Sequence, residues 1–157
     1  MLFRSPLLDE AGLRAGLGWF VEEFRERSGI AISLEVNPVV HRLRAELETA
    51  IYRLVVESLS NIHRHSQSKT AGIRISKKDR RVVVVVQDSG RGMSPGKLRA
   101  IAAGRGGVGC RIMAERVRAL GGALEIHSDG TGTVVTASLP LELPGAPGAS
   151  ESRDALT

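Results

Sequence analysis

The stretch Val82–Gly92 reads VVVVVQDSGRG and contains an unbroken run of five valines. Consecutive β-branched residues favour a buried β-strand. The acid Asp88 follows at the end of this strand, and Gly90 and Gly92 come shortly after it. Because glycine lacks a Cβ, a loop with two spaced glycines lets a ligand come close to the backbone. We therefore expect this strand to deliver a carboxylate to an open, glycine-rich loop.

An acid and two glycines in this pattern have two interpretations. The carboxylate of Asp88 suits a purine site, since it would accept a hydrogen bond from an exocyclic amine. Asp, Ser and Gly are also the usual residues of a turn after a buried strand, and taken alone the pattern favours such a turn. The choice between the two interpretations depends on the rest of the chain.

The composition indicates one globular domain. The chain has 157 residues, of which 42% are hydrophobic and 25% are charged, which is close to the average for folded proteins. The net charge of +5 could indicate a nucleic-acid partner, but aromatic residues make up only 3%. Since aromatic side chains are what proteins stack on bases, we expect no nucleic acid to bind. The single cysteine, Cys110, excludes an internal disulfide and fits a reducing cytoplasm.

The ends of the chain carry no membrane or secretion signal. No apolar stretch approaches the roughly 20 residues that a membrane-spanning helix needs, and the first residues lack the features of a secretory signal. We expect a soluble, cytoplasmic domain without membrane contact, with membrane anchorage of a parent protein left open. Residues 143–157 are rich in Pro, Gly, Ala and Ser, which predicts a disordered tail.

The order of helix and strand signals predicts an α+β fold. Hydrophobic spacing indicates helices over residues 13–27, 45–65, 97–102 and 108–120, and strands over residues 30–36, 71–76, 81–87, 123–127 and 133–139. Two of these strands follow one another through a short charged turn and are expected to be antiparallel. The expected architecture is a two-layer α/β sandwich, in which helices cover one face of a mixed, mostly antiparallel sheet.

The longest helical stretch, residues 45–65, places two polar residues beside its core face. On a helical wheel the core arc contains Leu47, Ile51, Leu54, Val55, Ser58, Leu59 and Ile62. Glu57 and Asn61 lie on the border of this arc, one turn apart. Each taken alone is an ordinary polar residue of a helix surface. Together they offer a carboxylate that could accept a proton or orient water, beside an amide oxygen that suits Mg²⁺.

A glycine-rich segment precedes the helix expected at residues 108–120. The spacing of Gly104, Gly106 and Gly109 matches G-x-G-x-x-G, but no strand leads into it, so the dinucleotide-binding motif is not supported. Residues 93–106 are therefore expected to form a flexible segment that leads into Gly107–Gly109. Unpaired N–H groups at the start of a helix favour an anion such as a triphosphate. A mobile surface loop ending in a capping glycine is the alternative.

Four segments taken in order resemble one superfamily. ESLSNIHRH at residues 57–65, DSGRGM at 88–93, GVG at 107–109 and GT at 132–133 resemble the N, G1, G2 and final boxes of the GHKL ATPases. That superfamily includes DNA gyrase, the ninety-kilodalton heat-shock chaperone, histidine kinases and MutL proteins. The sequence flanking these boxes is similar to that of sensor histidine kinases of the nitrate/nitrite-sensor type, and the resemblance extends from about residue 7 to residue 141.

This resemblance implies a Bergerat fold that binds ATP and Mg²⁺. By matched position, Asp88 would bind the adenine amino group, aided by Gly90, Gly92 and a water near Thr133. Asn61 would coordinate the Mg²⁺ that bridges the phosphates. Glu57 would be the catalytic residue, which polarises the nucleophile or supports the water shell of the metal. The other nucleotide-binding residues that the resemblance implies are Arg64, His65, Met93, Gly107, Val108 and Gly109, with residues 93–106 as the ATP lid.

The sequence departs from the family pattern in three respects. Cys110 stands where a leucine is usual, the lid is somewhat long, and no histidine has the E-[LI]-H-D context of a phosphoacceptor. We therefore expect a catalytic domain over residues 13–142, with residues 1–12 as the remnant of a joint to an absent dimerisation domain. Its partners would be the histidine-bearing dimerisation domain and, through the parent protein, a response regulator. The isolated domain is expected to be monomeric.

Two other functions stay open at this point. One is a stand-alone GHKL kinase of the anti-sigma type, which would phosphorylate a serine on an antagonist protein. The other is a non-catalytic, nucleotide-sensing module in which Glu57 and Asn61 have no role in catalysis. Magnesium-independent nucleotide binding would favour the module over both kinases.

Overall fold

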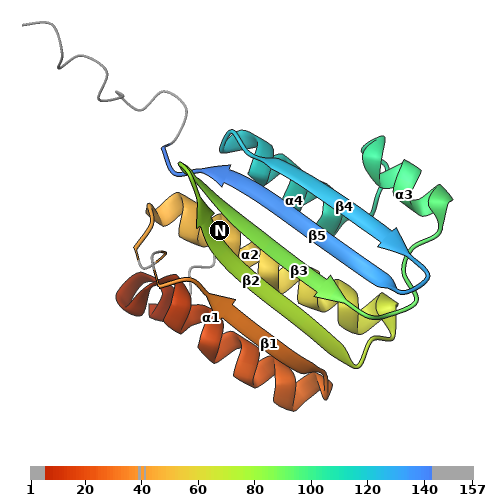
Figure 1. Ribbon diagram of the computed structural model, residues 1–157, viewed down its shortest axis with the longest axis horizontal. Helices are drawn as coiled ribbons and strands as arrows, with labels where there is room; N and C mark the ends of the chain where they lie inside the picture. The colour runs from red at the N-terminus through yellow and green to blue at the C-terminus, as the bar shows by residue number, and fades with distance from the viewer. Residues whose placement is uncertain (1–5, 39, 41, 143–157) are drawn as a thin grey trace, which may run out of the picture.

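A computed structural model describes residues 6–38, 40 and 42–142. Its helices are α1 (Pro6–Ser28), α2 (Ala45–Asn61), the π-helical turn η1 (Ile62–Ser66), α3 (Pro95–Ala102) and α4 (Val108–Ala119). Its strands are β1 (Ala31–Val36), β2 (Thr70–Lys78), β3 (Arg81–Asp88), β4 (Ala123–Asp129) and β5 (Gly132–Pro140), as Figure 1 shows. The tail expected at residues 143–157 lies outside the described residues, as does the first part of the joint expected at residues 1–12. None of the helices described is long and apolar enough to cross a membrane.

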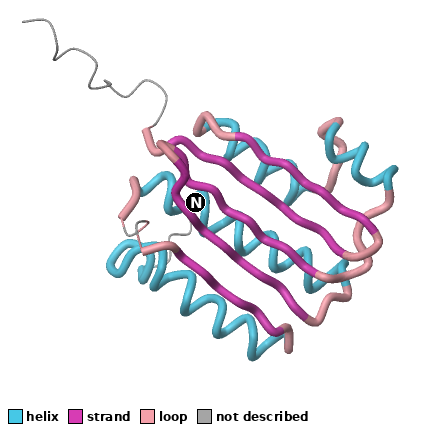
Figure 2. Tube along the Cα trace, viewed as in Figure 1, coloured by secondary structure: helices cyan, strands magenta, loops and turns pink. Residues whose placement is uncertain are grey.

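The strands form one mixed sheet in the order β1-β2-β3-β5-β4. The β1–β2 pair is parallel, and the β2–β3, β3–β5 and β4–β5 pairs are antiparallel. Helices α1, α2 and α4 lie on the same face of this sheet (Figure 2), whereas α3 stands apart near the end of β4 (Figure 1). The prediction of a two-layer α+β sandwich with a mostly antiparallel sheet is thereby confirmed.

The five valines form the middle of β3 at the centre of the sheet. Val82, Val84 and Val86 are each at most 1% exposed and face the helices. Val83 and Val85 point to the opposite face and are half-buried, since successive side chains of a strand alternate between the two faces. The run therefore supplies core packing on one face and a partly covered apolar surface on the other.

Helix α2 buries the face that the helical wheel predicts. Leu47, Ile51, Val55 and Leu59 have no measurable exposure. Glu48 is also buried, at 5% exposure, because its carboxylate accepts a hydrogen bond from the backbone N–H of the residue five positions earlier, at 3.1 Å. That buried carboxylate was not predicted from the hydrophobic pattern.

Two helices differ from their predicted forms. α1 begins at Pro6, before the predicted start, and Gly12 interrupts its helical geometry with φ 85° and ψ 178°. The helix predicted to continue to His65 is regular only to Asn61 and then widens into η1. Gln67, with φ 58°, ends that turn in the left-handed region. The hydrophobic pattern does not reveal this change, because Ile62 and Ser66, the first and last residues of η1, are both buried.

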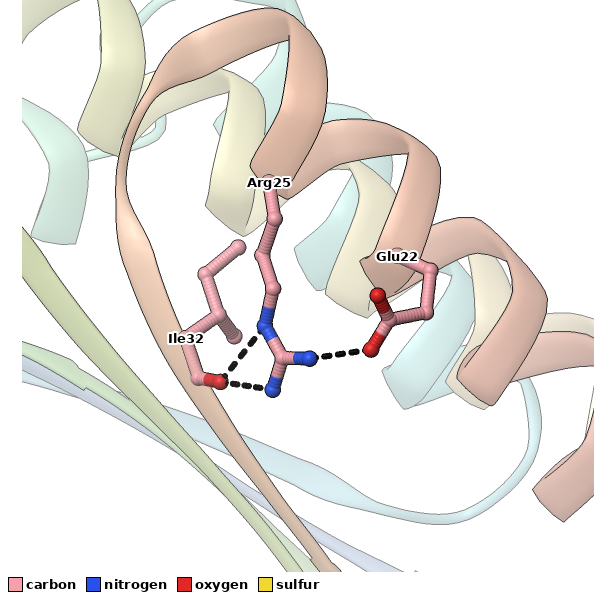
Figure 3. A network of polar contacts seen from close by, with 3 residues as sticks. All are labelled: Glu22, Arg25 and Ile32. Carbon is pink, nitrogen blue, oxygen red and sulfur yellow. Dashed lines mark hydrogen bonds and ion pairs between the residues drawn. The ribbon is translucent and has the colours of Figure 1, made fainter.

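Strand β1 forms one edge of the sheet, and an arginine lies along its free side (Figure 3). The N–H of Ala31 donates to the carbonyl of Lys69, so the backbone of the next residue, Ile32, faces away from β2. Arg25 donates to the Ile32 carbonyl through Nε, at 2.9 Å, and through Nη2. The other terminal nitrogen of Arg25 pairs with Glu22. This guanidinium occupies the position that the N–H of an added strand would take.

Candidate functional site

A cavity of about 900 Å³ opens where α2, η1 and the ends of the sheet strands meet α3 and α4. Eleven of the twelve residues that the sequence assigns to a site line this cavity, and they come from separate segments of the chain. They are Glu57, Asn61, Arg64, His65, Asp88, Gly92, Met93, Gly107, Val108, Gly109 and Thr133. The fold thus brings together residues that are up to 76 positions apart. The remaining one, Gly90, does not line the cavity.

Gly90 supports the site through a hydrogen bond to Asp88. Its backbone N–H donates to Asp88 Oδ1 at 2.8 Å, which orients the carboxylate while leaving it further acceptor capacity. A Cβ at position 90 would lie 2.2 Å from the carbonyl oxygen of Ser66. Only glycine therefore lets this loop pack against η1, and the close packing holds Asp88 in the cavity wall.

The loop after β3 is tied to η1 and to the residues that follow η1 by further hydrogen bonds. The N–H of Arg91 donates to the carbonyl of Ser66 at 2.9 Å, and Nε of Arg91 donates to the carbonyl of His65 at 2.9 Å. The N–H of Ser89 donates to Ser68 Oγ at 3.0 Å. As a result Asp88, at the end of β3, and the residues of η1 have a fixed relative position.

The carboxylate of Glu57 projects from α2 toward the start of α4. Its Oε1 is 3.6 Å from Nη2 of Arg64. A Cβ on Gly109 would lie 1.8 Å from the same oxygen. The carboxylate therefore contacts the first turn of α4, where unpaired N–H groups carry partial positive charge. Glycine at position 109 is what allows this approach.

The side chain of Asn61 is oriented by Cys110. Asn61 Nδ2 donates to Cys110 Sγ at 3.8 Å, a weak bond that engages the amino end of the amide and leaves Oδ1 available as an acceptor. Burial, reinforced by the Glu57 carboxylate, raises the pKa of the Cys110 thiol above its ordinary value. The thiol is thus kept neutral beside the amide.

A small hydrogen-bond network at the end of β4 was missed by sequence reasoning. Ser128 Oγ accepts the Met93 N–H at 2.7 Å and lies 2.7 Å from Thr133 Oγ1. It also donates to the carbonyl of Gly132 at 3.2 Å. This serine connects the β4–β5 hairpin to the segment that follows the glycine loop. Ser128 comes one residue after the end of the strand predicted over residues 123–127, and this position gave no signal of its role.

The floor of the cavity is apolar and was also not predicted. Five residues from α4, η1 and three strands form it, and these are Ile62, Val86, Met113, Ile126 and Val135. All five lie on the core side of their elements, so in the sequence they cannot be told from other core residues. An apolar floor together with polar lining groups suits an aromatic ligand that carries a charged tail.

The wall opposite α2 is loosely packed. None of the α3 residues is buried. Ser94 caps this helix by accepting the N–H of Lys97 at 3.2 Å. In the turn after α3, a Cβ on Gly106 would lie 2.7 Å from Ile101, so the segment folds back on itself rather than on the core. Residues 93–106 therefore have few contacts that would prevent them from moving.

Comparisons with known proteins agree with this geometry. Residues 46–143, more than half of the chain, match the family described as histidine kinase-, DNA gyrase B- and HSP90-like ATPase. The sensor histidine kinase MctS of Rhizobium johnstonii is 33% identical over 137 residues, which cover 87% of this chain and 29% of the relative. The sensor histidine kinase NarS of Mycobacterium tuberculosis is 32% identical over 87% of this chain and 31% of its own length. The chain thus spans about a third of these curated relatives.

Solved structures show the same fold. The histidine kinase domain of the Erythrobacter litoralis blue-light activated kinase EL346 superposes with a TM-score of 0.73 at 27% identity, over 85% of this chain and 68% of that one. The mycobacterial sensor histidine kinase MprB superposes with a TM-score of 0.64 over 84% of this chain. From its site, its fold and these matches, the chain belongs to the histidine kinase-, DNA gyrase B- and HSP90-like ATPase family.

Proposed function

We propose that this chain is the catalytic domain of a two-component sensor histidine kinase, which binds Mg-ATP and transfers the γ-phosphate to a histidine on a dimerisation domain. The observation that carries the proposal is that Asp88 and Asn61 line one cavity with an apolar floor. A purine would lie on that floor with its amino group at Asp88. Its phosphates would extend toward Asn61 and the start of α4.

The base-binding end of the cavity consists of Asp88 and its supports. The carboxylate of Asp88, oriented by the N–H of Gly90, would accept a hydrogen bond from the adenine amino group. Met93 begins the proposed lid and Gly92 directly precedes it. Thr133, at the start of β5, lines the same cavity as Asp88. Closure of residues 93–106 over the nucleotide would exclude water from the site.

The phosphate-binding end contains a cluster of hydrogen-bond donors. Arg64 and His65 come from η1. Gly107 is the N-cap of α4, and Val108 and Gly109 belong to its first turn. Backbone N–H groups at a helix start, together with a guanidinium, neutralise phosphate charge. Phosphoryl transfer depends mainly on such positioning and charge neutralisation.

The residues at Asn61 fit a magnesium ion. With Nδ2 engaged by Cys110, Oδ1 of Asn61 presents a neutral hard oxygen to the phosphate region. When bound, the ion would neutralise charge between the phosphates. Glu57 would accept a proton from, or orient, the incoming histidine nitrogen. That nitrogen forms a bond to the γ-phosphorus as the bond to the bridging oxygen breaks, and ADP leaves.

The partner surface lies beside the phosphate-binding end. Val108 and Ile112 are 67% and 43% exposed, one turn apart on α4. Apolar residues at this place suit a helix of the histidine-bearing domain, which must bring its acceptor to the γ-phosphate. We further propose a cytoplasmic location, a monomeric isolated domain, a response regulator that receives the phosphate through the parent protein, and the nitrate/nitrite-sensor subtype. The anti-sigma alternative is not favoured, since the relatives are sensor histidine kinases.

Titration of ATP with and without Mg²⁺ tests this function. Asp88→Asn replaces an acceptor oxygen with a donor, and we expect it to weaken ATP binding about ten- to a hundredfold. Asn61→Ala should abolish the magnesium-dependent gain in affinity and leave magnesium-free binding intact. Glu57→Gln should keep binding but lose phosphate transfer to a sensor-kinase dimerisation domain supplied in trans. Magnesium-independent binding that is unaffected by Asn61→Ala would instead favour a non-catalytic nucleotide-sensing module.

A further inference from the structure

Trp19 is a large aromatic side chain that the fold leaves in solvent. It is 53% exposed on α1, although a buried tryptophan contributes more to packing than most side chains. The next residue, Phe20, packs against Phe24 and Tyr52, whereas Trp19 makes no ring contact within the part of the chain that the structure describes. The packing of this domain therefore does not account for a tryptophan at position 19.

Three acidic residues share the face of α1 on which Trp19 lies. At about 100° per residue, they fall within about 60° of Trp19 on a helical wheel. They are Glu22, Glu23 and Glu26, and all three are exposed. The buried Leu17 lies on the opposite side of the helix. The outer surface of α1, called here the Trp19 face, thus presents one indole ring among three carboxylates.

The arginines of the same helix neutralise only part of this negative charge. Arg25 pairs with Glu22 and also donates to the backbone of β1, which holds it at that side of the helix. The guanidinium of Arg27 lies over an aromatic ring of α1, 5.4 Å from the ring centroid. Among the described residues, neither Glu23 nor Glu26 forms an ion pair. Two of the three carboxylates are therefore available to a cation from outside.

We propose that the Trp19 face is a docking surface for arginine side chains of a partner protein. A guanidinium stacks on an indole ring through a cation–π contact, and carboxylates beside the ring accept hydrogen bonds from its N–H groups. Tryptophan and arginine are also the residues that most often dominate the affinity of protein interfaces. The surface thus has both the ring and the acceptors that an arginine requires.

Charge separates this partner from the other candidates. The carboxylates of the Trp19 face repel phosphate, which disfavours nucleic acid and lipid headgroups. The whole chain has a net charge of +5, so two copies of it repel each other. A different protein that presents arginines is complementary to this face.

The Trp19 face is separate from the nucleotide cavity. Helix α1 packs beside β1 (Figure 1), and none of the residues that line the cavity belongs to α1. Docking at this face therefore goes beyond the proposed function, and the two can be tested independently.

The indole itself reports binding, because Trp19 is the single tryptophan of the chain. Titration of the whole chain with an oligo-arginine peptide should change its fluorescence to a saturating value. Oligo-lysine of the same length should bind more weakly, since an ammonium group does not stack flat on a ring, and oligo-glutamate should cause no change. No response to oligo-arginine, or an equal affinity for oligo-lysine, would overturn the proposal.

Paired charge removals show whether binding is local to this face. Glu23→Gln combined with Glu26→Gln should weaken oligo-arginine binding about fivefold. Glu46→Gln combined with Glu115→Gln is the matched control, which removes two exposed helical acids from other surfaces and should change the affinity little. Equal weakening in the two double variants would mean that the overall charge controls binding, and the Trp19 face would not be the docking surface.

Substitution of the ring gives a measure that does not depend on the glutamates. Trp19→Leu, followed by calorimetry, should weaken oligo-arginine binding about threefold, whereas Trp19→Phe keeps a ring and should lose less. An unchanged affinity of Trp19→Leu would contradict the proposal. A wild-type dimer in sedimentation that Trp19→Leu dissociates would also overturn it, by assigning the face to a second copy. All these variants should bind ATP as the wild type does, and wild-type protein that binds no ATP would overturn the proposed function alone.

Discussion

The two walls of the cavity are built in opposite ways. In α2, eight of 17 residues are buried, whereas none of the eight residues of α3 is. Glu57 and Asn61 therefore project from a helix fixed on the sheet, while the facing wall has little apolar contact with the core. A site of this kind holds its charged groups in place and leaves one side free to move over a ligand. Changes to the two walls should accordingly have different effects.

The largest difference is expected in stability. Ile51 of α2 has no measurable exposure, so Ile51→Ala should lower the free energy of unfolding by about 2–5 kcal/mol through lost burial and a cavity. Leu98 of α3 is half-exposed, and Leu98→Ala should cost less than about 1 kcal/mol. Urea unfolding of both variants measures the two losses in the free energy of unfolding. Equal losses would show that α3 is as well packed as α2.

The next largest effect is expected from the contact between Glu57 of α2 and Gly109 of α4. In Gly109→Ala the new Cβ would lie 1.8 Å from Glu57 Oε1, so the carboxylate must move. We expect phosphate transfer in trans to fall about ten- to a hundredfold, since small misplacements of reacting groups have effects of this size.

Gly18→Ala is the control for that substitution. A Cβ on Gly18 in α1 meets nothing within 4 Å, and alanine favours a helix by about 0.5–1 kcal/mol. Stability should rise slightly and transfer should not change. If Gly109→Ala were also without effect on transfer, the position of Glu57 would not be important for the reaction.

A smaller effect is expected from a substitution that changes only α3. Ser94→Ala removes the cap of α3, whose loss costs about 1 kcal/mol. Because α3 contributes no buried residue, the melting temperature should hardly change, whereas amide hydrogen exchange over residues 95–102 should accelerate about fivefold. A clear drop in melting temperature would mean that α3 is part of the cooperative core.

The smallest expected effect is on the reactivity of Cys110. The raised pKa of this thiol, due to burial and then to Glu57, lowers its thiolate fraction at neutral pH and slows alkylation. The alkylation rate of Cys110 should keep rising with pH over a range in which the rate of an ordinary thiol has already reached its plateau. Glu57→Gln removes one of the two causes and should speed iodoacetamide labelling roughly two- to threefold at pH 7.5. An unchanged rate would show that burial alone controls this thiol.

The fold was predictable from the sequence because its elements follow simple hydrophobic periods. The unbroken valine run of β3 marks a buried strand and the apolar arc of α2 marks a buried face, and Glu57 and Asn61 stand out as polar residues at the border of that arc. Ser128 and the buried Glu48 could not be predicted in this way. Their roles depend on partners from other segments, Met93 and Thr133 for the serine and a preceding loop for the acid.

The π-helical turn was missed for a different reason. In η1 the same residues stay buried whether the turn is α or π, so the hydrophobic pattern does not change. The widened turn nevertheless places the carbonyls of His65 and Ser66 where Arg91 can donate to them. The local backbone geometry, and not the order of residue types, thus carries this part of the site.

The arginine on the outer side of β1 also bears on how this protein behaves at high concentration. Sheets with a bare margin can add strands from neighbouring molecules and grow into insoluble assemblies. Here a positively charged side chain, itself anchored to an acid on its own helix, takes up one of the carbonyls to which an added strand would bind. Glu22, Arg25 and Ile32 thus oppose strand addition at one position of this margin.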